Sequence, residues 1–168
     1  MPTVECLLVR GEQLLLIRLP LNSSNPGMLL PIGGQVEPGE SPLEGCLRKV
    51  REQAGLVVSP SCAAVTFNTW SDGRTDYHVT FVAPAPEQEP VTNEREGEPE
   101  WIELKGVPYR QDIPELDRAL IPRILAASAP FAVHVNIDMT SDPYIRRLQS
   151  IEAIDPGRLS PLVFGTST

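Results

Sequence analysis

The feature that most constrains this 168-residue sequence is the stretch over residues 33–56, where a glycine pair leads into a helix with both ends marked. Ser41 is placed to cap the helix, and Pro42 fills its first position, where a missing N–H costs nothing. Glu44 completes a capping box with Ser41. Gly55 suits the left-handed conformation that ends a helix. The sequence therefore predicts a turn-rich loop after the glycine pair, followed by a helix that stops before Gly55.

Short apolar runs flank this helix on both sides. β-branched and alternating patterns predict strands, and tight turns join the first two pairs of them into hairpins. The predicted strands are 4–9, 14–18, 63–70, 76–83, 101–104 and 131–139. Helical periodicity over 115–125 predicts a helix that kinks or restarts at Pro122, and Asp142-Pro143 predicts the start of a last helix. Together these elements indicate a sheet covered by helices.

Charge and cysteine content narrow the class of function. Lys and Arg number 14 against 22 Asp and Glu, giving a net charge of −8, which disfavours binding to nucleic-acid polymers and to anionic membranes. The 3 Cys show no metal-ligand spacing and suit a reducing compartment. No apolar run reaches the roughly 18 residues that a membrane span needs. The expected location is the cytoplasm, and the length suits one domain.

The glycine loop and the capped helix resemble the Nudix box, whose pattern is G-x5-E-x7-R-E-U-x-E-E-x-G-U with U a bulky aliphatic residue. Seven of its nine fixed positions match in register: Gly34, Glu40, Arg48, Val50, Glu52, Gly55 and Leu56. This resemblance implies an α/β fold, the Nudix-type α/β/α sandwich with a mixed sheet. It implies a single Nudix domain over 1–168, with the box at 34–56. A strand and a helix at about 131–154 would be an appendage to its core.

Two of the box carboxylates are missing. Carboxylates at positions i, i+3 and i+4 share one helix face, where they can bind a hard divalent cation that activates water against phosphorus. The three positions hold Lys49, Glu52 and Gln53, whose formal charges sum to zero instead of −3. We therefore expect the Mg²⁺ or Mn²⁺ that the resemblance implies to bind weakly. Lys49 and Gln53 also have an ordinary interpretation as surface residues without a function.

The resemblance assigns further roles residue by residue. Gly33 resembles the residue whose backbone carbonyl joins the metal shell, as a ligand beside Glu52 and Glu96. Glu96 resembles a distal acid that binds metal or acts as a base, and Glu52 and Arg48 complete the catalytic set, with Arg48 paired to Glu40. The alternatives are a helix-surface ion pair for Arg48 and a solvated acidic run around Glu96.

Substrate contacts are expected from three side chains. Lys49 would contact phosphate in place of a metal. Glu115 and Asp117 resemble carboxylates that read a purine edge, although acids also favour helix N-termini for electrostatic reasons alone. The two histidines, His78 and His134, lack partners at ligand spacing and are expected to be structural.

Two functions stay open at this point, and a bare structural remnant that binds no nucleotide is the third possibility. The first is a Nudix-type pyrophosphohydrolase with an impaired or altered metal site, acting on a nucleoside diphosphate linked to another group, on a nucleoside triphosphate or on an oxidised purine nucleotide. The second is a catalytically silent Nudix-fold module that binds a nucleotide or serves regulation. In both, the partner is a small nucleotide, with no nucleic-acid polymer and no membrane, and a homodimer is left open.

Overall fold

The computed structural model of the protein describes residues 2–139 and 146–154. Its strands are β1 (Thr3–Arg10), β2 (Gln13–Arg18), β3 (Leu29–Gln35), β4 (Ser61–Trp70), β5 (Thr75–Pro84), β6 (Glu98–Glu103), β7 (Phe131–Met139) and β8 (Arg146–Ile154). Its helices are α1 (Pro42–Ala54), the 3-10 helix η1 (Leu104–Tyr109) and α2 (Glu115–Ala126).

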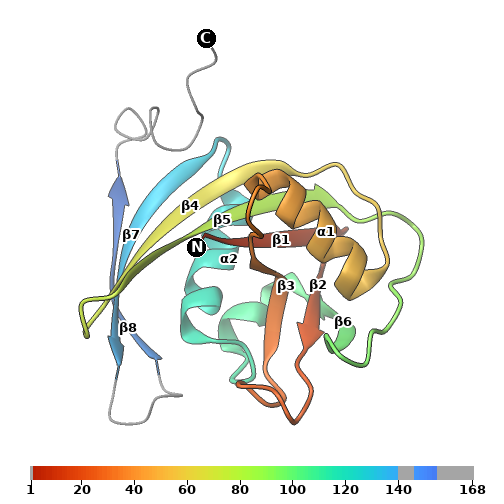
Figure 1. Ribbon diagram of the computed structural model, residues 1–168, viewed down its shortest axis with the longest axis horizontal. Coiled ribbons are helices and arrows are strands. Elements are labelled where there is room, and N and C mark those ends of the chain that lie inside the picture. The colour runs from red at the N-terminus through yellow and green to blue at the C-terminus, as the bar shows by residue number, and fades with distance from the viewer. Residues whose placement is uncertain (1, 140–145, 155–168) are drawn as a thin grey trace.

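The described strands form one mixed sheet in the order β6-β2-β3-β1-β5-β4-β7-β8. β1 pairs with β5, and β4 with β7, in parallel, while the other neighbours are antiparallel. Figure 1 shows β7 and β8 at one end of the sheet and β6 at the other. The parallel β1–β5 pair stands at the centre of the sheet. Residues of the first strand therefore lie beside residues about 75 positions later in the sequence.

Alternation along the strands gives the sheet two apolar faces. In β2, Leu14 and Leu16 belong to one core cluster, which includes residues of η1 and α2. Leu15 and Ile17 belong to the other, which includes residues of α1. Because successive strand residues point to opposite faces, the continuous apolar run of β2 is explained by a helix on each side. The predicted α/β/α sandwich with a mixed sheet is confirmed.

The helix predicted after the glycine pair is confirmed as α1. The Ser41 side chain accepts from the Glu44 backbone N–H, and the Glu44 carboxylate accepts from the Ser41 backbone N–H at 2.8 Å. Gly55 ends the helix with φ at 66°, a left-handed conformation that favours glycine. These caps fix where α1 begins and therefore which residues face the sheet.

The second predicted helix is also present, with one difference. α2 runs from Glu115 to Ala126 without restarting at Pro122. Its apolar side packs on the sheet through Leu120, Ile121 and Ile124, which are all buried. We attribute the unbroken helix to this burial, which outweighs the hydrogen bond that proline removes.

The predicted last helix is wrong. Residues 142–145 of its expected segment lie outside the described residues, and the rest forms the strand β8. β8 pairs antiparallel with β7, from Ala132 opposite Ile154 to Met139 opposite Arg146. A helix this short is marginal in isolation, whereas the open edge of β7 offers a full set of backbone partners. The appendage expected at 131–154 is thus a strand pair that extends the sheet.

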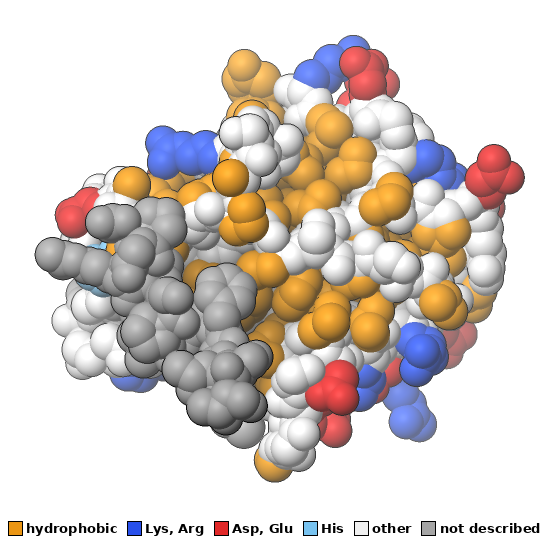
Figure 2. Space-filling view, turned by 90° about the horizontal axis from the view of Figure 1, so that it is seen from above, with side chains coloured by type: hydrophobic (Ala, Val, Ile, Leu, Met, Phe, Trp, Pro, Cys, Tyr) orange, Lys and Arg blue, Asp and Glu red, His pale blue; other side chains and the backbone are white. Residues whose placement is uncertain are grey.

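Two features of the structure concern the expected absence of a membrane partner and the possible homodimer, namely the length of the helices and the exposed hydrophobic side chains. Within the described part of the chain, no helix is long and apolar enough to cross a membrane. Figure 2 shows hydrophobic side chains gathered in the middle of one face, with charged side chains toward its margin. The exposed large hydrophobic residues of the described chain are Leu21, Leu43, Val57, Tyr77, Val91 and Tyr109. A homodimer stays a prediction.

Candidate functional site

Arg48 ties the box loop to α1. Its guanidinium donates to both carboxylate oxygens of Glu40, at 2.7 and 2.9 Å, and to the backbone carbonyl of Gln35 at 3.1 Å. It also donates to Glu52 one turn along the helix, at 3.2 Å. The hydrogen bond from Arg48, followed by the backbone N–H of Glu37, lowers the pKa of Glu40 to about 2. The structure thus gives Arg48 contacts that orient the loop and a helix-surface pair at once.

Lys49 lies among the carboxylates that a metal would need. Its ammonium is 2.9 Å from Glu52 Oε2 and 3.7 Å from Glu96 Oε2, and its side chain is only 17% exposed. Burial alone would raise the pKa of Glu52, but the hydrogen bonds from Lys49 and Arg48 outweigh it and lower that pKa. The Lys49 side chain also packs on Gly34, because a Cβ added there would stand 2.8 Å from Lys49 Cε.

The side-chain amide of Gln53 forms hydrogen bonds with both backbone polar groups of Gly33. The Gln53 Oε1 accepts from the Gly33 backbone N–H at 2.9 Å, and its Nε2 donates to the Gly33 carbonyl at 3.1 Å. The same Nε2 donates to Glu96 Oε2 at 2.8 Å. One neutral amide therefore engages the carbonyl and the distal carboxylate that were expected to face a cation.

These residues do not fit a divalent cation. Mg²⁺ and Mn²⁺ are bound by oxygen ligands, yet an ammonium and an amide N–H stand beside the two remaining carboxylates, Glu52 and Glu96. Among the described residues, no group of three or more His, Cys, Asp or Glu could hold a metal ion. The expectation of weak metal binding has this physical basis and stays a prediction.

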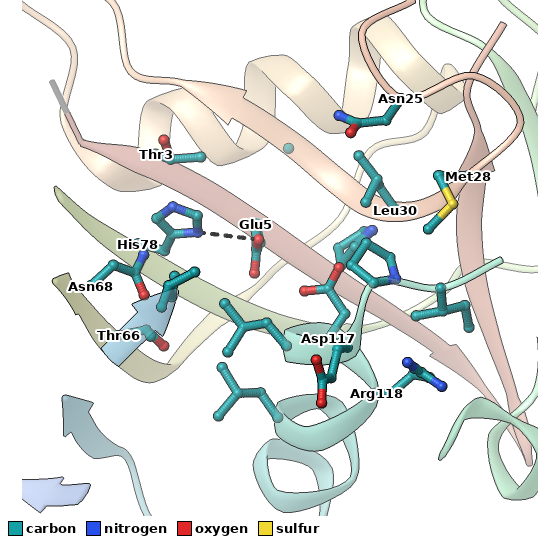
Figure 3. Close-up of a pocket in the computed structure, with 18 of the residues that line it drawn as sticks. Thr3, Glu5, Asn25, Met28, Leu30, Thr66, Asn68, His78, Asp117 and Arg118 are labelled. Carbon is teal, nitrogen blue, oxygen red and sulfur yellow. Dashed lines mark hydrogen bonds and ion pairs between the residues drawn. The ribbon is translucent and has the colours of Figure 1, made fainter. Parts of the chain in front are cut away.

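A large pocket lies next to this cluster. Its volume is about 1130 Å³, and it extends from Gly33 and Gly34 near the end of β3 to the first turns of α2. Figure 3 shows side chains from β1, β3, β4, β5 and α2 around it. Glu115 and Asp117 line the pocket, whereas the described lining does not include Arg48, Lys49, Glu52 or Glu96. The predicted site residues thus form two groups, with the glycine pair between them.

One end of the pocket is built from polar side chains of three central strands. His78 Nδ1 lies 3.3 Å from Glu5 Oε1 (Figure 3). His78 Nε2 lies 3.7 Å from Asp76 Oδ1. Asn68 Nδ2 donates to the same Asp76 oxygen at 2.6 Å. Burial lowers the pKa of His78, but the hydrogen bond to Glu5 and the charges of Glu5, Asp76 and Asp117 outweigh it and raise that pKa.

This group was missed from the sequence, since His78 was expected to be only structural. A signal was present in the period-two spacing of Asp76 and His78 on one strand. Glu5 was a second signal, as a single carboxylate inside an otherwise apolar strand. What the sequence could not supply is the register, which sets Glu5 opposite Thr80 and Thr3 opposite His78 in the parallel β1–β5 pair.

The C-terminal strand pair supplies part of the pocket wall. Ile137 of β7 and Leu148 of β8 both line the pocket. The backbone N–H of Leu148 donates to Glu115 Oε2 at 3.3 Å, which ties β8 to the start of α2. Glu115 therefore has a structural contact in addition to the substrate role expected of it.

An ionic cluster fastens the loops at the rim of the pocket. Arg18 donates to both oxygens of Glu100, to Asp112 Oδ2 at 3.1 Å and to the Gly27 carbonyl at 2.8 Å. Arg110 donates to the same Asp112 oxygen at 2.6 Å. The hydrogen bonds from Arg110 and then Arg18, opposed by burial, lower the pKa of Asp112 to about 2.

Stability should therefore fall in acid. Because the folded-state pKa of Asp112 lies below its ordinary value of 3.8, its contribution is complete above about pH 4 and is lost as the pH falls toward 2. We expect Asp112→Asn to remove about 1–2 kcal/mol of this pH dependence, after allowance for solvent screening. Urea unfolding at pH 5 and pH 2.5 measures it. Glu12→Gln in an exposed turn is the control, and an equal pH dependence in the two variants would contradict the assignment.

Comparison with known proteins identifies the fold and the family. A family model described as NUDIX domain matches residues 1–124. The NAD-capped RNA hydrolase NudC of Stutzerimonas stutzeri (strain A1501) is 41% identical over 59 residues, which are 35% of this chain and 21% of that protein. The chain thus matches about a fifth of the length of that curated relative.

Solved structures agree on the fold. The MutT protein of Bacillus halodurans superposes with a TM-score of 0.74 at 22% identity, covering 90% of this chain and 96% of that one. The MutT protein of Methanosarcina mazei Go1 superposes with a TM-score of 0.65 at 24% identity, covering 73% and 91%. The match over residues 1–124, which includes the glycine loop and α1, shows that the chain belongs to the Nudix family.

Proposed function

We propose that this Nudix chain binds a nucleoside diphosphate derivative or a nucleoside triphosphate in the large pocket, and that its metal-dependent hydrolysis is impaired. The observation that carries the proposal is the Gln53 amide, which engages the Gly33 carbonyl and Glu96 Oε2 at once. These groups would have to face a cation for the family's chemistry. Family membership supports the nucleotide ligand, and the pocket volume of about 1130 Å³ leaves room for one.

Lys49 supports a phosphate contact without a metal. Its ammonium lies 3.6 Å from the position that a Cβ on Gly34 would take, and Gly34 lines the pocket. A phosphate placed at the glycine pair would therefore come near a cation that belongs to the chain, and an ammonium–phosphate hydrogen bond is charge-assisted. Of the two functions left open by the sequence, these contacts favour the catalytically silent binding module over the hydrolase.

The test is binding and turnover on one set of samples. We expect a panel of nucleotides to raise the melting temperature without added metal, because a ligand that binds only the folded state stabilises it. Turnover with Mg²⁺ or Mn²⁺ is expected to be slow or absent. Metal-dependent turnover that Glu52→Gln abolishes, and that the exposed control Glu103→Gln keeps, would favour the hydrolase instead. A panel without any thermal shift or turnover would contradict both functions.

A further inference from the structure

The polar end of the pocket is rich in hydrogen-bond acceptors. We call Glu5, Asn68, Asp76 and His78 the acceptor end. The side chains of Glu5, Asp76 and His78 are 23%, 36% and 24% exposed, so a ligand in the pocket can reach them. An ionised carboxylate has about four acceptor positions. Glu5 uses only part of its acceptor capacity, in contacts with His78 Nδ1 and Thr80 Oγ1 that are each 3.3 Å long.

Asn68 adds a buried acceptor oxygen that receives no hydrogen bond. The residue is 2% exposed and lines the pocket, and its Oδ1 has no hydrogen-bond partner. The amide cannot reverse its two ends without cost, because Nδ2 faces the acceptor-only carboxylate of Asp76 at 2.6 Å. A buried carbonyl oxygen without a donor costs about 1–3 kcal/mol. A ligand that supplies an N–H would remove this cost.

The charges at this end favour donors and oppose anions. The charged groups that face His78 are Glu5 from β1, Asp76 from β5 and Asp117 from α2. These three carboxylates outnumber the one imidazole that they face, so the sum of these four charges is negative even when His78 is protonated. A phosphate would meet repulsion from these carboxylates, whereas Lys49 offers it a cation beside Gly34.

We propose that the acceptor end recognises the amino group of a heterocyclic base through Glu5 and Asn68, and so selects amino-bearing bases over their oxo or unsubstituted counterparts. This inference rests on the proposed nucleotide function and adds the part of the ligand that this end of the pocket reads. The donor is an N–H of the base, and the acceptors are a Glu5 carboxylate oxygen and Asn68 Oδ1. No covalent step is involved.

The experiment compares pairs of nucleotides that differ at one group. GTP and ITP differ only by the 2-amino group, and CTP and UTP differ by an amino group against an oxo group. We expect the amino member of at least one pair to bind about tenfold tighter or more, the size of one hydrogen bond to a charged group. Isothermal titration without added metal measures both affinities.

Two variants locate the discrimination. Glu5→Gln keeps the size of the side chain and removes its charge, and Asn68→Ala removes the unpartnered carbonyl. Each is expected to bring the two members of the selected pair to within about threefold, whereas Glu103→Gln on β6 keeps the wild-type ratio. Melting temperatures confirm folding, and the wild-type comparison stands even where a variant is unstable.

The outcomes separate this inference from the function on which it rests. If no nucleotide binds, the proposed function fails and the inference fails with it. If nucleotides bind but neither pair is discriminated, the inference alone is overturned. It is equally overturned if the discrimination survives in both Glu5→Gln and Asn68→Ala, because the amino group is then read elsewhere.

Discussion

Replacing Lys49 and Gln53 together by glutamate is expected to create a magnesium site. The change takes the local charge at these two positions and Glu52 from 0 to −3. It also releases the Gly33 carbonyl and Glu96, which Gln53 now engages. Oxygen ligands gathered in this way are what a hard divalent cation requires. We expect Mg²⁺ or Mn²⁺ to bind at least tenfold tighter than to the wild type, which corresponds to about 1.4 kcal/mol.

Calorimetry and thermal melting check this without any substrate. Without metal, the added carboxylates should repel one another and lower the melting temperature, and Mg²⁺ should restore it. The wild type should respond little to Mg²⁺. The control is Lys105→Glu with Gln88→Glu, which makes the same charge change at two exposed positions away from the cluster. If the double variant binds Mg²⁺ no more tightly than this control, the box segment has only a structural role and two substitutions do not turn it into a metal site.

Turnover is a separate readout of the same variant. A gain of pyrophosphohydrolase activity would mean that the pocket still places a pyrophosphate at the restored cluster. Metal binding without turnover would mean that the pocket now serves binding alone, in line with the proposed function.

Gly33→Ala is expected to destabilise the protein by about 3 kcal/mol, near the upper end for an overpacked site. A Cβ on Gly33 would lie 2.2 Å from the Val4 carbonyl oxygen and 3.1 Å from Glu5 Cα. Both belong to the backbone of β1, which is held between β3 and β5, so no flexible side chain can move aside. Urea unfolding measures the loss, which arises without any metal or ligand.

Gly106→Ala is the matched control for this substitution. Gly106 lies in η1, and a Cβ there meets nothing within 4 Å, so the stability should change by less than about 1 kcal/mol. Equal stabilities for the two variants would show that β1 and β3 are less closely paired than described. The result also separates the packing role of Gly33 from the ligand role that its resemblance implies.

The fold was predictable wherever the signal is local. Ser41, Glu44 and Gly55 act within one or two turns of α1, so the sequence alone indicates both ends of that helix. The segment after Asp142 was not predictable, because the β7 edge that recruits β8 lies outside it. Pairing across a sheet depends on what stands beside a strand, which no window of the sequence contains.

The candidate site divides in the same way. Lys49, Glu52 and Gln53 share a helix face by spacing alone, so the sequence is sufficient to show that two carboxylates are missing. The two hydrogen bonds between Gln53 and Gly33 could not be predicted, because they depend on how closely α1 approaches β3. Glu5 and His78 meet through the register of a parallel pair, which sequence reasoning did not provide.

The wall that β7 and β8 give the pocket separates residues that shape ligand binding from the residues of the Nudix box. Ile137 and Leu148 lie beyond residue 124, where the family match ends, whereas the box residues lie well within it. Swapping this ribbon for another would reshape the space around a bound molecule and leave the Lys49 cluster untouched. In this architecture, the shape of the ligand pocket and the chemistry of the Nudix box depend on different segments of the chain. A change in one segment need not disturb the other.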